Sequence, residues 1–164
     1  MTNTLSGKVA LITGSGRGIG KEIALHMAAE EAKVIVNDPG VNVDGSQGSE
    51  LPAESVVNEI RKSGGIAVPN FGNVSNFSDA KSMIEDAVHK FGKLDIVVTC
   101  AGILRDRMIF NMTEEEWDAV VNTHLKGTFN VLRHASSHFR QQRSGRIITF
   151  SSESGLMGNQ GQSN

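Results

Sequence analysis

Apolar and polar positions alternate along the chain in two different rhythms. Short apolar runs rich in β-branched residues predict strands at 9–12, 33–37, 66–71, 94–98 and 146–150, and the runs 33–37 and 94–98 are typical of buried parallel strands. Longer segments carry apolar residues at every third or fourth position, which predicts helices over 18–31, 53–63, 77–91 and 113–139. Strands that alternate with helices favour a parallel sheet with right-handed crossovers. We therefore expect one α/β domain over residues 1–164, a doubly wound sheet with helices on both faces in three α/β/α layers.

Several residues mark where these elements begin and end. Asn76 is a predicted N-cap, and Gly92 is placed to end the helix that follows it. Thr113 and Glu116 have the spacing of a capping box at the start of the last long helix. Pro69 lacks a backbone donor for a sheet ladder, so the third strand is expected at an edge.

The apolar face of segment 113–139 has two explanations. Its residues recur in alternating steps of three and four, which is typical of a helix that packs against another helix, either in the core or at a subunit interface. They are Trp117, Val121, Leu125, Thr128, Leu132, Ala135 and Phe139. His134 and His138 share this segment at metal-ligand spacing, but without a third ligand solvent-facing histidines are favoured over a zinc site.

Three glycines join the first strand to the first helix. Gly14, Gly18 and Gly20 allow a sharp turn and a close approach of the backbone to a ligand. The free N–H groups of the helix and its dipole then favour a bound phosphate. A Walker loop is excluded because Gly20 and Lys21 lie at the wrong distance from Gly14. The alternative is a purely structural turn.

Asp38 ends the second strand about twenty residues after the glycine turn. At this interval a dinucleotide-binding fold places an acid that hydrogen-bonds the ribose hydroxyls of NAD and repels the additional phosphate of NADP. NAD is therefore the expected cofactor. The alternative is that Asp38 only begins the following turn. Residues 39–52 are polar and rich in glycine, and we expect them to form a surface loop that acts as a lid or edge near the adenosine.

Composition narrows the possible classes of protein. A net charge of −2 argues against a nucleic-acid surface. The sequence shows no targeting segment and no apolar stretch long enough for a membrane, so we expect a soluble cytoplasmic protein. One cysteine, Cys100, fits a reducing compartment. The 164 residues contain no tyrosine.

Taken together, these motifs resemble the short-chain dehydrogenase/reductase family and its Rossmann-like fold. The resemblance rests on the Thr-Gly-x-x-x-Gly-x-Gly pattern at 13–20, on Asp38, and on the strand ends at 73–74, 101–102 and 151–152. Within this family, the sequence most resembles the 3-hydroxyacyl-CoA dehydrogenase domain of peroxisomal multifunctional enzymes and their bacterial relatives. The segments that carry this likeness are Val36–Gly40, Gly102–Arg107 and His124–Phe129. This resemblance implies NAD-linked oxidation of a secondary alcohol, or the reverse reduction, on an acyl-CoA or acyl-carrier thioester. It also implies a homodimer or homotetramer.

The resemblance also assigns roles to individual residues. Ser152 would hydrogen-bond the substrate oxygen, and His124 takes the position of a helix asparagine that organises a catalytic water. Thr99 and Cys100 replace the usual pair of asparagines, so a contact that stabilises the sheet is expected to be missing. The residues implied to bind the cofactor are Gly14, Ser15, Gly16, Arg17, Gly18, Ile19, Gly20, Asp38, Asn73, Val74, Cys100, Ala101 and Gly102. No metal is implied.

The family's proton-transferring tyrosine, with a lysine four residues later, is expected about thirteen positions after Ser152, one step beyond Asn164. We therefore expect this sequence to be the N-terminal part of a longer enzyme, without its C-terminal strands and inactive alone. One alternative is a genuine short protein that binds NAD without turnover. Another is a regulatory NAD-binding subunit of a hetero-oligomer. A structural scaffold is the weakest reading, because it gives the strand-end glycines and Asp38 no purpose.

Overall fold

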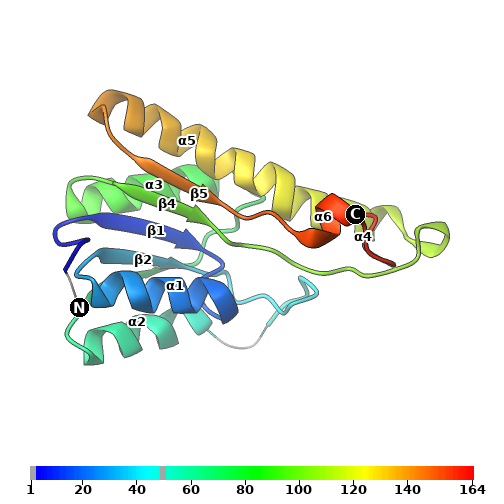
Figure 1. The fold of residues 1–164 in the computed structure, drawn as a ribbon, viewed down its shortest axis with the longest axis horizontal. Coiled ribbons are helices and arrows are strands. Elements are labelled where there is room, and N and C mark those ends of the chain that lie inside the picture. The colour runs from blue at the N-terminus through cyan, green and yellow to red at the C-terminus, as the bar shows by residue number, and fades with distance from the viewer. Residues whose placement is uncertain (1–2, 49–50) are drawn as a thin grey trace.

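The computed structural model describes residues 3–48 and 51–164. Within this part of the chain lies a parallel five-stranded sheet in the order β3-β2-β1-β4-β5 (Figure 1). The strands are β1 (Val9–Thr13), β2 (Lys33–Asn37), β3 (Ile66–Asn70), β4 (Ile96–Thr99) and β5 (Arg146–Thr149). The predicted parallel sheet is confirmed, and Pro69 lies on the edge strand β3 as expected.

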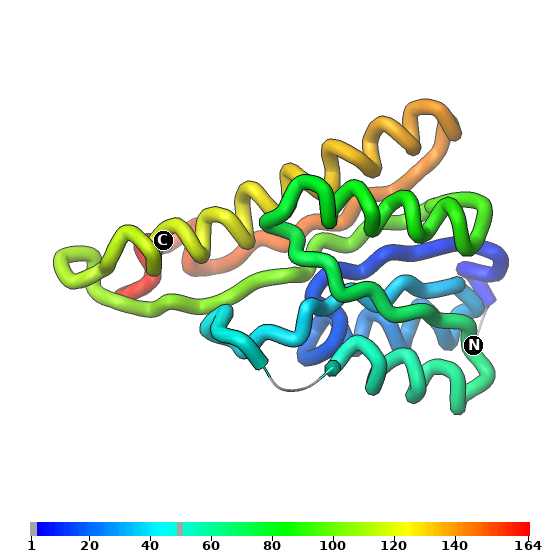
Figure 2. Tube along the Cα trace, turned by 180° about the vertical axis from the view of Figure 1, so that it is seen from behind, coloured from blue at the N-terminus to red at the C-terminus, as the bar shows by residue number. Residues whose placement is uncertain are grey.

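Helices cover both faces of this sheet, which confirms the three-layer architecture (Figures 1 and 2). On one face, α1 (Gly18–Ala29) and α2 (Pro52–Lys62) bury Ala24, Val56 and Ile60 against the strands. On the other face, α3 (Phe77–Phe91) and α5 (Gly127–Gln142) form a second core cluster with β1 and β4. The shorter elements are a 3₁₀ turn at Ile109–Asn111, α4 (Glu114–Val121), a π-helical segment at Asn122–Lys126 and α6 (Glu153–Met157).

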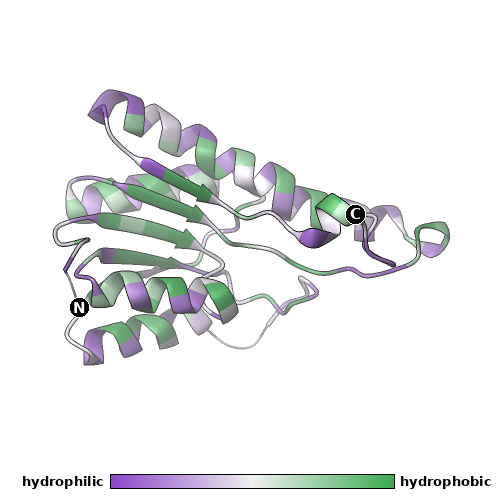
Figure 3. Ribbon diagram, viewed as in Figure 1, coloured by the Kyte–Doolittle hydropathy of each residue, from purple (hydrophilic) through white to green (hydrophobic). Residues whose placement is uncertain are grey.

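The strands differ sharply in burial, although all have apolar sequences. Every residue of β1 and β4 is buried, as expected for strands covered on both faces. All four residues of β5 are exposed, including Ile147 and Ile148. Figure 3 shows these strands mainly in green, next to helices in which green and purple residues are mixed. The sequence of β5 therefore resembles that of a buried strand, although β5 forms an edge of the sheet.

The predicted caps are present. Asn76 accepts hydrogen bonds from the backbone N–H groups of Ser78 and Asp79, and Gly92 ends α3 in the left-handed conformation. Thr113 and Glu116 form the predicted capping box. The backbone N–H of Thr113, together with the Arg107 guanidinium, holds the pKa of Glu116 below its ordinary value.

The predicted helix over 113–139 forms without a break, but it contains a π segment, Asn122–Lys126, between α4 and α5. The wider turn of such a segment rotates the buried face relative to a regular helix. Trp117 is 42% exposed and Leu125 71% exposed, whereas Ala135 is fully buried. The buried positions across these elements are Val120, Gly127, Asn130, Val131 and Ala135.

The two histidines on α5 were expected to face solvent, but both are half-buried. His134 lies against Phe77, with 4.4 Å between ring centroids, and Nε2 of His138 lies 3.1 Å from Oε1 of Gln142. The described residues contain no group of three side chains able to hold a metal ion. None of the helices in the described ranges is long and apolar enough to cross a membrane. Predictions about residues 1–2 and 49–50, within the N-terminal stretch and the loop 39–52, lie outside the described residues.

We predict that Asn76→Ala lowers the free energy of unfolding by about 1 kcal/mol, because the first turn of α3 loses the cap for two backbone N–H groups. Urea denaturation followed by circular dichroism measures this difference. Ser82→Ala is the matched control, since Ser82 lies on the exposed face of the same helix and bonds only to a carbonyl of Ser78. Equal stability of the two variants would contradict the prediction.

Candidate functional site

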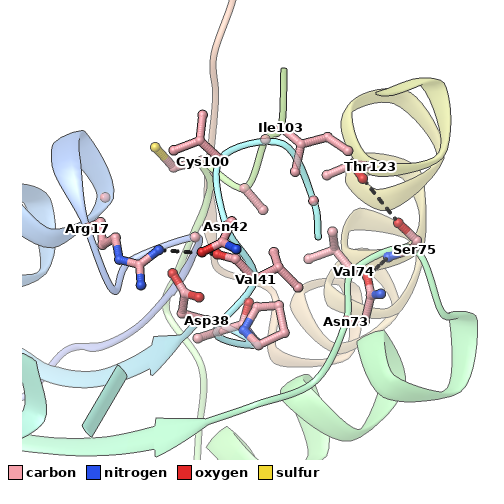
Figure 4. Close-up of a pocket in the computed structure, with 18 of the residues that line it drawn as sticks. Arg17, Asp38, Val41, Asn42, Asn73, Val74, Ser75, Cys100, Ile103 and Thr123 are labelled. Carbon is pink, nitrogen blue, oxygen red and sulfur yellow. Dashed lines mark hydrogen bonds between the residues drawn. The ribbon is translucent and has the colours of Figure 1, made fainter. Parts of the chain in front are cut away.

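A pocket of about 500 Å³ lies at the carboxyl ends of the strands. The loops after β1, β2, β3 and β4 meet there, as expected for an open α/β sheet. Figure 4 shows Arg17 and Asp38 on one side of the pocket, and Asn73 and Thr123 on the other. Of the residues expected to bind the cofactor, those that line it are Gly14, Arg17, Gly18, Ile19, Gly20, Asp38, Asn73, Val74, Cys100, Ala101 and Gly102.

The glycine turn is shaped by close backbone contacts. Gly14 has φ +63°, and a Cβ there would lie 2.6 Å from Cα of Ala101. A Cβ on Gly20 would collide with the carbonyl oxygen of Gly14. Gly18 also has positive φ, but a Cβ there would meet nothing within 4 Å. Gly14 and Gly20 therefore allow the backbone to pack closely on itself, whereas Gly18 leaves room at the mouth of the pocket.

Ser15 and Gly16, also expected to bind the cofactor, are buried and are not among the residues that line the pocket. The Ser15 hydroxyl donates to the carbonyl of Ile12 at 2.7 Å, and the Ser15 N–H donates to Asn37 at 2.9 Å. A Cβ on Gly16 would lie 2.7 Å from Oδ2 of Asp38. These residues connect the ends of β1 and β2.

The N-terminus of α1 lies at the pocket, where Gly18, Ile19 and Gly20 form part of the lining. Among the described residues no side chain caps this helix, whose N-cap residue is Arg17. Nη1 of Arg17 instead donates to the carbonyl of Val41 at 3.2 Å. The N–H groups and the dipole of a helix N-terminus suit a phosphate, and the open space at Gly18 leaves room for one. These features fit the pyrophosphate of a dinucleotide.

Asp38 is held in place by two backbone donors. Its Oδ2 accepts from Gly16 N–H at 3.1 Å and its Oδ1 accepts from Gly40 N–H at 2.8 Å. Two hydrogen bonds leave further lone pairs on the carboxylate, which can accept from the hydroxyls of a ribose. The alternative in which Asp38 only begins the next turn accounts for its bond to Gly40, but not for its position on the pocket wall.

Asn73 and Val74 line the opposite wall. Oδ1 of Asn73 accepts from the Ser75 N–H at 2.9 Å, and the Val74 carbonyl accepts from Nδ2 of the buried Asn130 at 2.9 Å. The loop 39–52, expected as a lid or edge of the site, contributes Pro39, Val41, Asn42, Val43 and Gly45 to the pocket. Sequence reasoning did not single out the remaining lining residues, which are Asn37, Ser75, Ile103, Ala119, Asn122 and Thr123.

One buried hydroxyl fixes the exit of β4. Oγ1 of Thr13, 1% exposed, accepts from the backbone N–H groups of Cys100 and Ala101 at 3.1 and 3.2 Å. The neighbouring hydroxyl of Thr99 is buried without a hydrogen-bond partner in the described part of the chain.

His124 and Ser152 do not line this pocket. Nε2 of His124 lies 3.1 Å from the Ile103 nitrogen and 2.9 Å from its carbonyl oxygen. One ring nitrogen either accepts or donates, so the tautomer decides which of these two bonds forms. The Ser152 hydroxyl accepts from Ser154 N–H at 3.2 Å and thereby caps α6.

Comparison with known proteins identifies the family. The sequence model described as short chain dehydrogenase matches residues 8–164. The chain belongs to the short-chain dehydrogenase family. A crystal structure of a short chain dehydrogenase from Mycobacterium avium superposes with a TM-score of 0.88 at 48% identity, covering 96% of this chain and 58% of that one.

Three curated proteins illustrate the range of its relatives. A short-chain type dehydrogenase/reductase of Mycobacterium tuberculosis is 46% identical, covering 96% of this chain and 55% of that protein. Peroxisomal multifunctional enzyme type 2 of Drosophila melanogaster is also 46% identical, over 96% of this chain and 26% of its own length. A 3-oxoacyl-(acyl-carrier-protein) reductase of Staphylococcus aureus is 44% identical, covering 96% of this chain and 61% of that protein. The chain thus spans between a quarter and two thirds of these relatives.

We predict that Thr13→Val lowers the free energy of unfolding of this short-chain dehydrogenase chain by about 2 kcal/mol, because two backbone N–H groups lose their acceptor. Chemical denaturation measures the change. Thr149→Val is the matched control on exposed β5. Wild-type stability of Thr13→Val would contradict the role given to its hydroxyl.

Cys100 provides a chemical probe of the same pocket. Burial raises the pKa of its thiol above the ordinary value, so the reactive thiolate is scarcer at pH 8 than in an exposed cysteine. We predict slow alkylation by iodoacetamide that accelerates as the pH rises beyond 9, measured by mass spectrometry. The urea-unfolded chain is the control, in which the same thiol reacts at an ordinary rate. Equal rates in folded and unfolded chains at pH 8 would contradict this prediction.

Proposed function

We propose that the chain forms the NAD-binding part of a dehydrogenase that oxidises a secondary alcohol or reduces the corresponding ketone. The observation that carries this proposal is the Asp38 carboxylate, held on the pocket wall by Gly16 and Gly40. It stands at the end of β2, where a dinucleotide-binding fold holds the adenosine ribose. Its negative charge favours ribose hydroxyls and disfavours the 2′-phosphate of NADP.

The rest of the cofactor would follow the walls of the pocket. The pyrophosphate would lie at the N-terminus of α1, beside Gly18 and Ile19. The adenine would lie against Asn73 and Val74, and Cys100–Gly102 would border the nicotinamide half. The bound cofactor supplies hydride chemistry, while these residues orient it and exclude water.

Ser152 and His124 are proposed to act on the substrate side. Ser152 would donate a hydrogen bond to the substrate oxygen, and its present role as the cap of α6 fixes its backbone. His124 would position the exit of β4 through Ile103 and hold a water in the proton path. A tyrosine is required as proton donor in this scheme, and the 164 residues contain none. We therefore propose that this chain alone binds NAD without turnover.

The names of the relatives suggest the substrate class. One relative is named for the reduction of a 3-oxoacyl group on a carrier protein, and others are multifunctional peroxisomal enzymes. We propose a 3-hydroxyacyl or 3-oxoacyl thioester, carried by coenzyme A or by a carrier protein, for the complete enzyme, which would be a homodimer or homotetramer. The single free cysteine suits a cytoplasmic location. The alternative is a catalytically inactive NAD-binding or regulatory subunit of a hetero-oligomer.

We predict that Asp38→Asn weakens NAD binding by about tenfold or more, because hydrogen bonds from the ribose lose a charged acceptor. The same change lowers the preference for NAD over NADP. Isothermal titration with both cofactors measures the two affinities. Asp44→Asn is the matched control, since Asp44 is an exposed carboxylate nearby whose Oδ1 accepts from Ser46 N–H. Tighter binding of NADP than of NAD by the unmodified chain would sink the proposal.

A turnover assay distinguishes a chain that only binds NAD from a chain that also catalyses the reaction. We expect NAD binding but no loss of NADH absorbance with an acetoacetyl thioester, because a serine and a histidine cannot replace the missing proton donor. The control is the same assay with a complete 3-oxoacyl reductase. Measurable turnover by the purified 164-residue chain would refute the role given to the tyrosine.

A further inference from the structure

The loop after Asp38 crosses the pocket as a closed strap, defined here as residues 40–48. Its ends meet: a Cβ added to Gly48 would collide with the carbonyl oxygen of Gly40, and Val41 forms an antiparallel bridge with Gln47. The turn between them is held by Asn42, whose N–H donates to the Ser46 carbonyl at 2.9 Å. In Figure 4 the strap runs between the Asp38 side of the pocket and the Thr123 side.

The tip of the strap is fastened to the segment that leaves β4. The Val43 carbonyl accepts from Leu104 N–H at 2.9 Å. A Cβ on Gly45, which has φ +80°, would lie 2.9 Å from Cδ1 of Ile103. At the other end, Gly40 N–H binds the carboxylate of Asp38. The strap therefore joins the ribose acid of the proposed cofactor site to the exit of β4.

The segment after Leu104 is joined in turn to the helix that carries Ser152 at its start. Arg107 N–H donates to the Gly161 carbonyl at 2.7 Å, and Nε2 of Gln162 donates to Oδ2 of Asp106 at 3.0 Å. Oε1 of Gln162 accepts from the Ser154 hydroxyl in α6 at 2.8 Å. The ribbon of Figure 1 and the tube of Figure 2 both show the red C-terminal segment beside the yellow-green connection to α4. Each contact is short and directional, and the set is continuous.

We propose that the strap is a mechanical link between the adenosine end of the cofactor site and the Ser152 side. An adenosine nucleotide that engages Asp38 fixes Gly40 and the strap, and the strap then holds Leu104 and the segments packed against it. A ligand that contacts only the adenosine end thereby orders residues 103–107 and 153–163. This inference rests on the proposed cofactor site, and it adds a coupling that the site alone does not require.

The test uses ADP, which ends at the phosphates and carries no nicotinamide half. We measure amide hydrogen exchange of the 164-residue chain by mass spectrometry, with and without saturating ADP. We expect ADP to slow exchange in residues 14–20, and to slow it by about fivefold in 103–107 and 153–163, the lower end of usual coupling between sites. Exchange in the outer strand β5 serves as an internal reference.

Two variants cut the link without changing Asp38 or the glycine turn. Because residues 42, 43 and 45 also line the pocket, ADP is raised in each variant until residues 14–20 reach the protection seen in the parent chain. In the first, residues 42–46 are replaced by Asn-Gly, since a two-residue turn closes an antiparallel pair such as Val41 and Gln47. In the second, Gly45→Val places a branched side chain at positive φ and against Ile103, which lifts the tip. Gln47→Ala is the control, because Gln47 is exposed and contributes its backbone to the strap.

We expect both variants to keep the protection of 14–20 by saturating ADP and to lose it in 103–107 and 153–163, while Gln47→Ala behaves as the parent chain. Protection of 14–20 without any effect on 103–107 in the parent chain overturns the coupling and leaves the cofactor site standing. Persistence of distant protection in both variants also overturns it. Failure of ADP to bind, or to protect 14–20, overturns the proposed cofactor site and the coupling together.

Discussion

The site depends on the close approach of two strand ends. Gly14 lies against the backbone of Ala101, and the hydroxyl of Thr13 holds the N–H groups of Cys100 and Ala101. A larger residue at position 14 would separate β1 from the exit of β4, because the contact is between backbone atoms that cannot rotate away. The glycine turn, the first helix and the floor of the pocket are all positioned relative to this contact. Asp38 is then brought to the same edge by its bond to Gly16.

Much of this arrangement could be predicted because its signals are local. The caps at Asn76 and Thr113 depend on spacing within one turn of helix, and Asp38 follows from its distance to the glycine turn along the chain. The course of the strap could not be predicted, since it depends on a bond between Val43 and Leu104, 61 positions apart, which no local pattern records. The same holds for α6, whose neighbours are fixed by Gln162 and Asp106.

The edge strand β5 shows a second limit of sequence patterns. The element forms where expected, but all four of its residues are exposed, although two of them are isoleucines. Hydrophobicity indicates which surface favours burial, but it does not say what covers that surface. Trp117 and Leu125 on the neighbouring helical elements are exposed in the same way. Core packing therefore explains only part of the apolar face of segment 113–139. Trp117 and Leu125 fit the other explanation given for this face, a subunit interface.

The π segment Asn122–Lys126 has a consequence for how the chain can change during evolution. A π turn arises from one inserted residue, so a single-codon deletion in this region would restore a regular helix. Every side chain before the deletion would then turn by about 100° relative to α5, the rotation of one helical residue. The imidazole of His124 would leave Ile103, and Thr123 would leave the pocket wall. Insertions and deletions should therefore be tolerated less well here than substitutions.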